Sequence, residues 1–272
     1  MGIQAIEQRE PSTDPLPIPD ITDAEREVAD LLPINASPTD ARAALESVPL
    51  WFHTFALNGQ ADIYSPGVAR DHRYRIPALP ESFAGMSVLD VGAFDGFYSF
   101  LAEARGAERV LAVDNEQGVH WAETRWGKRL EGGEGFRAIA GLLESDVEYQ
   151  VQDAQDLAEL DEQFDFVFCF GILHRVENPL GLLSTLKSRL APGGRVLVET
   201  HGCHLDDASP SLHVFEAGDV YARDDFVYWG FTPESLRRLG ALAGFGSFDL
   251  IDAPIIDGHP RLIGSLNGVG TR

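Results

Sequence analysis

Aspartates stand at the ends of three apolar runs, in positions that are typical of a ligand site. Asp90, Asp114 and Asp153 each end or directly follow a run with the character of a buried strand. Because ligands bind outside the carboxyl ends of parallel strands, these side chains should line one site. Asp114 also stands 22 positions after Gly92, close to the offset of about 20 residues at which an acid binds ribose hydroxyls. The pattern predicts a nucleoside site, whereas helix capping could explain any one acid alone.

The turn from Gly92 to Gly96 indicates which nucleoside ligands are favoured. Gly92 permits a tight turn and a close approach of the ligand. A dinucleotide would need Gly-x-Gly-x-x-Gly to seat its pyrophosphate on a helix N-terminus. Phe94 occupies the place of the second glycine, and Asp95, just before the helix, would repel phosphate. The turn therefore disfavours a dehydrogenase and favours a ligand without phosphate, whose cationic ammonium group Asp90 or Asp95 could attract.

Histidines follow two later strands, on the side from which a substrate should approach. His174 comes after the fourth strand and His201 after the fifth. An unperturbed histidine pKa of about 6.5 suits a general base at neutral pH. We therefore expect His174 and His201 to be catalytic bases, with a structural or substrate-orienting role as the alternative for each. His201, His204 and His213 with Cys203 fit no metal-ligand spacing, so no metal site is expected.

The elements that must position these residues alternate along the chain. Apolar strands are predicted at 87–91, 109–113, 147–151, 164–170, 195–199, 248–251 and 261–266, with helices at 96–105, 119–130, 136–143, 179–190 and 233–243. Apolar strands separated by helices indicate a parallel sheet covered on both faces. The connection between the last two strands is too short for a helical crossover, so they should be antiparallel. The predicted fold is α/β: a Rossmann-like, seven-stranded, doubly wound sheet with an antiparallel last strand.

Two segments outside this alternation should cover the site. Residues 1–67 are expected to form an N-terminal helical arm and cap segment, in which Thr22 and Glu25 have the spacing of a capping box and 51–67 is irregular. The main domain is then 68–272, with a long insertion at 203–230. Loops of this length in compact domains are usually functional. We expect the insertion to be an aromatic substrate lid, with a dimer contact as the alternative.

The composition limits the partners. The net charge of −22 repels phosphate backbones and anionic membranes, so neither nucleic acid nor a membrane is expected. Arg70, Arg73 and Arg75 form a local basic cluster that is expected to be a solvated loop. The cysteines, Cys169 and Cys203, suggest free thiols in a reducing compartment. With no signal-peptide pattern and no apolar run approaching about 18 residues, the protein is expected to be cytoplasmic, and a homodimer is left open.

Three segments are similar, in the right order, to motifs of the class I S-adenosylmethionine (SAM)-dependent methyltransferases: Val88–Ser99, Phe168–Pro179 and Leu190–Gly194. The resemblance covers about residues 84–202 and implies SAM as the cofactor. It implies that Asp153 accepts the adenine amino group and that the Phe170 region lines the methionine end. Cofactor contacts are therefore expected from Asp90, Gly92, Phe94, Asp114, Asn115, Asp153, Ala154, Phe170 and Gly171.

Other segments are similar to the branch that contains the tRNA wobble-uridine 5-oxyacetate (carboxymethyl) transferases and their small-molecule relatives. They are Trp51–His53, Pro66-Gly67, Asp95–Ser99, Gly171–Leu173 with Pro179, Val227-Tyr228 and Thr232-Pro233. We expect Trp51 to offer an aromatic face to the sulfonium, and His53 to help cover SAM.

The chain departs from the tRNA enzymes after Gly171–Leu173. Those enzymes carry Tyr-His-Arg-Arg where this chain has His174, Arg175, Val176 and Glu177, and a basic, lysine-containing stretch upstream is also missing. The missing groups would hold a carboxylated SAM and the anionic tRNA. We therefore expect methyl transfer from SAM to a small-molecule acceptor in specialised metabolism, with oxygen favoured over nitrogen or carbon. The alternatives are a tRNA wobble-uridine modifying transferase and a non-catalytic SAM-binding module.

Overall fold

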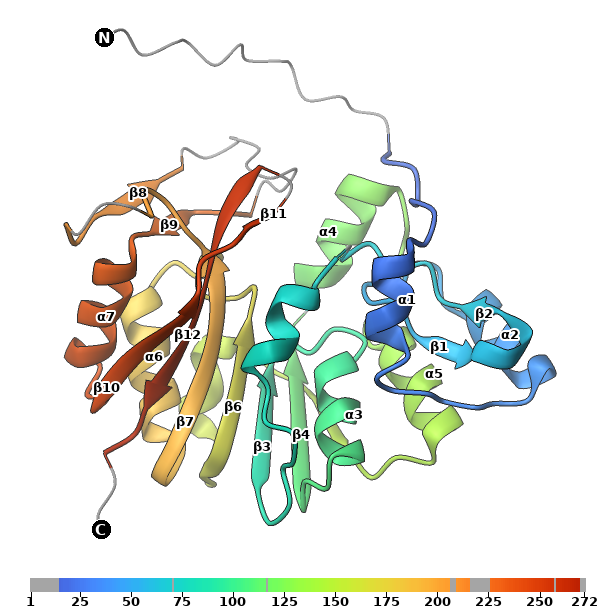
Figure 1. Ribbon diagram of the computed structural model, residues 1–272, viewed down its shortest axis with the longest axis horizontal. Coiled ribbons are helices and arrows are strands. Elements are labelled where there is room, and N and C mark those ends of the chain that lie inside the picture. The colour runs from blue at the N-terminus through green and yellow to red at the C-terminus, as the bar shows by residue number, and fades with distance from the viewer. Residues whose placement is uncertain are drawn as a thin grey trace, which may run out of the picture.

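A computed structural model of the protein describes residues 15–69, 71–115, 117–205, 209–215, 226–256 and 258–269. The strands of its central sheet are β3 (Ser87–Val91), β4 (Arg109–Asp114), β5 (Glu148–Val151), β6 (Phe164–Phe170), β7 (Leu190–His201), β10 (Ser247–Asp252), β11 (Ile255–Ile256) and β12 (His259–Asn267). Seven of them follow the order β10-β12-β7-β6-β3-β4-β5, and the short β11 pairs with β12 (Figure 1).

The direction and order of the strands define where a ligand can bind. Strands β3 to β7 pair in parallel, whereas β12 runs antiparallel to both β7 and β10. From β3 the chain runs outward through β4 to β5, and then returns to β6 on the other side of β3. This reversal between β3 and β6 is the topological switch point, where a crevice forms at the carboxyl ends of the strands. The predicted seven-stranded, doubly wound sheet with an antiparallel last strand is confirmed.

Both faces of the sheet are buried at its central strands β3, β4 and β6, because neighbouring residues of these strands belong to different cores. Val88 and Phe166 lie in one apolar cluster, whereas Leu89 and Val167 lie in the other. The first face is covered by α3 (Phe97–Ala104) and α5 (Glu134–Leu143), and the second by α6 (Pro179–Ser188) and α7 (Pro233–Leu242) (Figure 1). Another helix, α4 (Gln117–Trp126), contributes to a small third apolar cluster beside the turn that follows β3, at residues 92–96, called the cofactor turn below.

The N-terminal segment adds two helices and a hairpin. The predicted capping box is confirmed at α1 (Asp23–Ala29), where Thr22 and Glu25 cap each other, and α2 (Pro38–Ser47) starts after Ser37. The prediction that residues 51–67 are irregular throughout was wrong. The strands β1 (Ala56–Asn58) and β2 (Ile63–Tyr64) pair there, because the Asn58 side chain caps a 3-10 turn between them.

Residues of this cap segment share a core with the main domain. Trp51, Phe55 and Leu57 belong to the same cluster as Phe97 and Phe100 of α3. Trp51 is 2% exposed and its ring lies against that of Phe55. The cap therefore packs on the first face of the sheet, beside the start of α3.

Strand β7 is longer than predicted. It begins at Leu190 and includes the Pro192-Gly193-Gly194 turn, where the sequence indicated only 195–199. A β carbon on Gly194 would lie within 3.0 Å of three backbone oxygens, including that of Phe164. Glycine thus lets the turn approach β6 closely enough for the pairing to extend to Phe164 and Leu190, across a shift in register.

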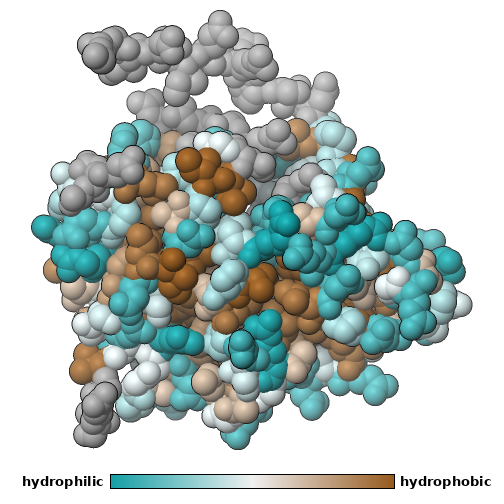
Figure 2. All heavy atoms as spheres, viewed as in Figure 1, coloured by the Kyte–Doolittle hydropathy of each residue, from teal (hydrophilic) through white to brown (hydrophobic). Residues whose placement is uncertain are grey.

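Polar residues gather over the cap elements at the right of the molecule in Figure 2, whereas hydrophobic residues lie on the face toward β7, β10 and β12. Leu250, Ile251 and Ile255 are among the exposed apolar side chains of that second region. Much of the predicted lid, namely 206–208 and 216–225, lies outside the described residues, as do 1–14 of the predicted arm and Arg70 of the predicted basic cluster. No helix among the described residues is long and apolar enough to cross a membrane.

Candidate active site

The turn after β3 is held in a conformation that favours glycine. Gly92 has φ +77°, and a β carbon there would lie 2.2 Å from Cδ1 of Ile172, in the loop after β6. Phe94 also has a positive φ, +52°. Its backbone N–H donates to Asp114 at the end of β4, which stabilises this unusual conformation. The ends of β3, β4 and β6 therefore meet at one point.

A cleft opens at this point. Its empty volume, open solvent included, is about 630 Å³. Five of the predicted cofactor residues line it: Gly92, Asp114, Asn115, Asp153 and Ala154. The rest of the wall includes Arg175, Val176 and Glu177 after β6, and Tyr228. The structure thus brings together the acids that end separate strands, as the sequence indicated.

Asp114 and Asp153 are linked through Asn115. The Asn115 side-chain amide donates to Asp153 at 2.7 Å, and its backbone N–H donates to Asp114 at 2.7 Å. Asp153 also accepts from the N–H of Gln155 at 2.8 Å, which caps the 3-10 helix Ala154–Glu159. Burial raises the pKa of Asp114 to about 6, so its carboxylate is ionised at neutral pH. Helix capping and a ligand contact are therefore compatible at Asp153.

The other predicted cofactor residues lie outside the lining of this cleft. Phe94 lines a second cavity on the far side of Asp114, together with Gly118 and Tyr149. Asp90 is buried, accepts from the Ser99 hydroxyl at 2.6 Å, and has its pKa raised by burial to about 7. Four further predicted cofactor residues line neither cavity: Trp51 and His53 in the cap, and Phe170 and Gly171 at the end of β6.

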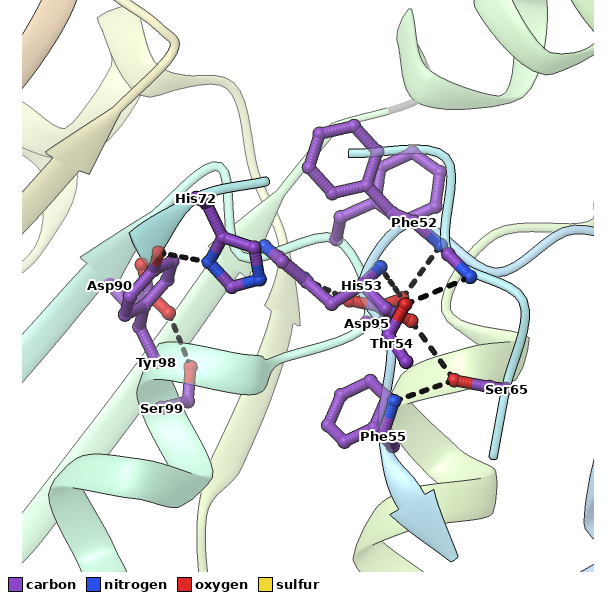
Figure 3. Close-up of polar contacts among 12 residues, drawn as sticks. Phe52, His53, Thr54, Phe55, Ser65, His72, Asp90, Asp95, Tyr98 and Ser99 are labelled. Carbon is purple, nitrogen blue, oxygen red and sulfur yellow. Dashed lines mark hydrogen bonds and ion pairs between the residues drawn. The ribbon is translucent and has the colours of Figure 1, made fainter. Parts of the chain in front are cut away.

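Asp95 fixes the cap to the cofactor turn (Figure 3). Its Oδ2 accepts from the backbone N–H groups of Phe52 and His53, both at 2.8 Å, and its Oδ1 lies 2.5 Å from Nδ1 of His53. The carboxylate is 1% exposed. Close contact of Gly67 with the backbone of His53 and Thr54 supports the same segment, since a β carbon there would lie 2.4 Å away. Both oxygens of Asp95 thus hold the cap segment against this turn.

A second buried polar group lies beside the first. His72 Nδ1 is 2.6 Å from the hydroxyl of Tyr98, and the rings of His53 and His72 are 5.2 Å apart (Figure 3). The Tyr98 ring also contacts Phe170 at 4.7 Å, at the end of β6. Sequence reasoning missed His72, because residue types alone do not show which side chains meet under the cap.

The prediction that Arg75 belongs to a solvated loop was wrong. Arg73 is exposed and pairs with Asp71, but the Arg75 side chain is only 11% exposed and pairs with Glu199 at 2.9 Å. Glu199 is fully buried near the end of β7 and also lies 3.7 Å from Arg261 of β12. An acid inside the apolar run of β7 needs a buried cation, and this signal could have identified the pair.

His174 and His201 lie next to each other, with ring centroids 4.3 Å apart. Both are buried, and burial is the main reason that the pKa of each lies well below its ordinary value, so both are neutral. Nε2 of His201 accepts from Arg261 at 2.6 Å. Nδ1 of His174 accepts from the backbone N–H of His201 at 3.4 Å and lies 3.2 Å from the Thr200 hydroxyl. In this arrangement Nε2 of His174 carries the ring proton.

Within the described residues, no group of three or more His, Cys, Asp or Glu side chains is arranged to hold a metal ion. Cys169 and Cys203 are not joined in a disulfide.

A parallel sheet with a nucleoside-type cleft at its switch point and no phosphate-binding turn defines a class I SAM-dependent methyltransferase. The methyltransferase-domain family model matches residues 66–246, two thirds of the chain, and the protein belongs to this family. The enzyme class and the SAM cofactor predicted from the sequence are confirmed.

Curated relatives support the predicted branch. The tRNA U34 carboxymethyltransferase of Campylobacter hominis is 28% identical over 173 residues, which cover 64% of this chain and 55% of the relative. That of Klebsiella pneumoniae is 30% identical over 180 residues, covering 65% and 48%. The chain thus spans about half the length of the curated relatives it matches.

Solved structures show the same fold. The N-terminal domain of EvdMO1, crystallised with SAH and D-fucose, has a TM-score of 0.58 and 21% identity, covering 84% of this chain and 95% of that one. The 1,6-didemethyltoxoflavin-N1-methyltransferase of Burkholderia thailandensis has a TM-score of 0.51 and 20% identity, covering 94% of both chains.

Proposed function

We propose that the protein transfers the methyl group of SAM to an oxygen atom of a small molecule, in specialised metabolism. The observation that carries this proposal is the charge of the cleft. Asp114, Asp153 and Glu177 line it against one cation, Arg175, and Glu134 adds another acid to the neighbouring cavity. A polynucleotide that brings several phosphates to this opening would be repelled, whereas a small acceptor need not contact these acids.

The residues of the cleft fit SAM by their chemistry. The ionised Asp114 can accept from ribose hydroxyls, Asp153 and Asn115 suit the adenine edge, and Gly92 leaves room for the methionyl part. When bound, SAM would supply a methyl group on a cationic sulfur; transfer to a hydroxyl oxygen would leave S-adenosylhomocysteine and release the hydroxyl proton. The work of the protein is to align the acceptor and to exclude water. We assign Trp51, His53, Asp90, Phe94, Phe170 and Gly171 to the layer that shapes and closes this site.

The catalytic assignment of His174 and His201 stays a prediction, and their geometry gives it a specific form. Each is neutral, and each already uses its lone pair to accept a hydrogen bond. A base role would require His174 to exchange its tautomer. Orientation of the acceptor by the Nε2–H group of His174 needs no such change, and we favour it. Replacing His174 by Gln should then raise KM more than it lowers kcat.

The test uses SAM with a labelled methyl group, offered to the full chain with total tRNA in one reaction and with mixed small hydroxylated compounds in another. We expect label in the small-molecule products, and a methyl ether or ester on analysis. Label in tRNA that is lost as salt is raised would overturn the proposal. The tRNA alternative rests on the curated relatives, which are named tRNA U34 carboxymethyltransferases.

The division into an arm and cap at 1–67 and a methyltransferase domain at 68–272, with a lid at 203–230, stays a proposal. So do the cytoplasmic location and a homodimer.

A further inference from the structure

Two arginines, one in the 3-10 helix Arg73–Ala78 and one in β12, share a single carboxylate. Arg75 Nη2 lies 2.9 Å from one oxygen of Glu199, and Arg261 Nη1 lies 3.7 Å from the other. The Tyr74 hydroxyl also donates to Glu199, at 3.3 Å. Glu199 is fully buried, while the arginine side chains are 11% and 19% exposed. Two guanidinium charges against one carboxylate leave an excess positive charge, which is costly in a desolvated place unless another anion is near.

The neighbouring groups do not balance this excess. His72, His174 and His201 have pKa values held below the ordinary value, mainly by burial, and are neutral. Arg175 adds a further positive charge that acts on His174. Asp90 also acts on Arg75, but the pKa of Asp90 is raised to about 7, so this carboxyl group is only partly ionised at neutral pH.

Hydrogen-bond donors in the same place lack acceptors. Among the described residues, Arg75 Nε, Arg261 Nε and His174 Nε2 are buried and have no hydrogen-bond partner. A buried donor without a partner is energetically costly, so three together indicate an acceptor from outside the chain. These donors belong to one connected cluster. Arg75 and Arg261 both lie against Glu199, Arg261 also donates to His201, and the backbone N–H of His201 donates to His174.

The position of this cluster is on the acceptor side of the site. The Arg75 guanidinium lies 5.2 Å from the centre of the Phe170 ring and 5.7 Å from that of Tyr98. Phe170 ends β6, next to the strand that ends in the cofactor turn. Two acids of the cleft, Asp114 and Asp153, lie at the ends of β4 and β5 on the other side of β3, and the third, Glu177, follows β6. A single anion can therefore bind here although the protein as a whole is strongly acidic, because two arginines converge on one carboxylate beside neutral histidines.

We propose that Arg75, Arg261 and His174 bind a carboxylate of the methyl acceptor, so that the acceptor is a carboxylic acid. This inference rests on the proposed function, because it assumes a small-molecule acceptor. Guanidinium groups pair with carboxylates through strong, charge-assisted hydrogen bonds, and the His174 Nε2–H group adds a neutral donor. The aromatic rings beside Arg75 favour an acid whose carbon skeleton is apolar or aromatic.

The test compares ligands that differ only in charge. Benzoate, phenylacetate and hexanoate are titrated calorimetrically against the full-length protein saturated with S-adenosylhomocysteine, each beside its primary amide. We expect at least one acid to bind about 10- to 100-fold more tightly than its amide. Equal binding of all acids and amides, or no binding of any acid, would overturn the proposal.

Variants assign the preference to the cluster. In Arg261→Gln the preference for the acid should disappear, whereas Arg109→Gln, which removes a partly exposed arginine paired with Glu148 and Glu162, should keep it. Glu199→Gln removes the competing carboxylate and should tighten binding of the acid. A purely structural ion pair predicts no such gain, so unchanged or weaker binding in Glu199→Gln contradicts the proposal even if Arg261→Gln fails to fold.

A carboxylate could instead belong to the cofactor. If Arg261→Gln weakened the binding of a carboxylated SAM and left benzoate binding unchanged, the assignment to the acceptor would be wrong. Failure of the proposed function gives a different result, namely labelled methyl in tRNA in the transfer assay.

Discussion

Removal of the Asp95 carboxylate should destabilise the protein more than any comparable surface change. The carboxylate accepts from two backbone N–H groups and one ring N–H, all in a buried place. Each donor left without a partner costs about 1–3 kcal/mol, and outward relaxation of the 51–54 segment should keep the total near the low end. We therefore expect Asp95→Ala to lower the free energy of unfolding by about 3–5 kcal/mol.

The measurement is urea denaturation of the full chain, with SAM affinity measured by calorimetry. Asp165→Ala is the matched control, since Asp165 also accepts from a backbone N–H and a hydroxyl, both of Ser87, but is exposed. The control should lose under about 1 kcal/mol. Asp95→Ala should also weaken SAM binding, because Asp95 joins the cap to the turn that contains Gly92. An Asp95→Ala variant as stable as Asp165→Ala would refute the assignment of Asp95 as the link between the cap and the turn.

Three further changes test the cofactor site and its electrostatics. Gly92→Ala places a methyl group 2.2 Å from Ile172 at φ +77°, so SAM affinity should fall and stability should fall by about 1–3 kcal/mol. The control is Gly141→Ala on α5, which has no atom within 4 Å and should be neutral or stabilising. Equal effects of the two variants would contradict the close contact at Gly92. Asp114→Asn should weaken SAM binding about 10- to 100-fold, and wild-type affinity should fall below about pH 6 as this carboxylate is protonated; unchanged affinity would remove Asp114 from the ribose site. The pKa of Asp90 is raised by burial from 3.8 to about 7, so the folded state holds a proton that the unfolded state has released between these values. Wild type should therefore lose stability relative to Asp90→Asn as the pH rises from about 4 to about 8, by as much as about 4 kcal/mol, and a constant difference in urea midpoints would contradict this.

The parts of the fold that the sequence predicted are those with a regular period. The strands that become β3, β4 and β6 are apolar on both faces because each face packs against its own core, and this made them visible as continuous runs. Asp114 and Asp153 were identified for a related reason. An acid at the end of a predicted strand must lie at the carboxyl edge of a parallel sheet, although β5, which precedes Asp153, is largely exposed rather than buried on both faces.

Contacts between distant segments could not be predicted in the same way. The hairpin β1–β2 is too short to show a period of two, and it is stabilised by a side-chain cap and by packing on α3. The bond from Asp95 to His53 joins two motifs 42 positions apart, and spacing alone does not show that they meet. Arg75 was misplaced because it was grouped with the nearby Arg70 and Arg73, whereas its partner, Glu199, comes 124 positions later.

The charge of the protein is unevenly distributed, so its net charge describes the cofactor cleft but not the arginine cluster around Glu199. A value of −22 describes the surface and the cofactor cleft, where Asp114, Asp153 and Glu177 lie. Around Glu199 the local charge is positive instead, because Arg75 and Arg261 converge on this one acid and the histidines beside them are held neutral by burial. A methyltransferase must keep a cationic sulfonium apart from groups that would compete with its acceptor. The acids at the ends of β4 and β5 suit the cationic cofactor, and Arg75 and Arg261 suit an anionic acceptor. The two ligands would therefore bind at sites of opposite charge, on either side of the end of β6.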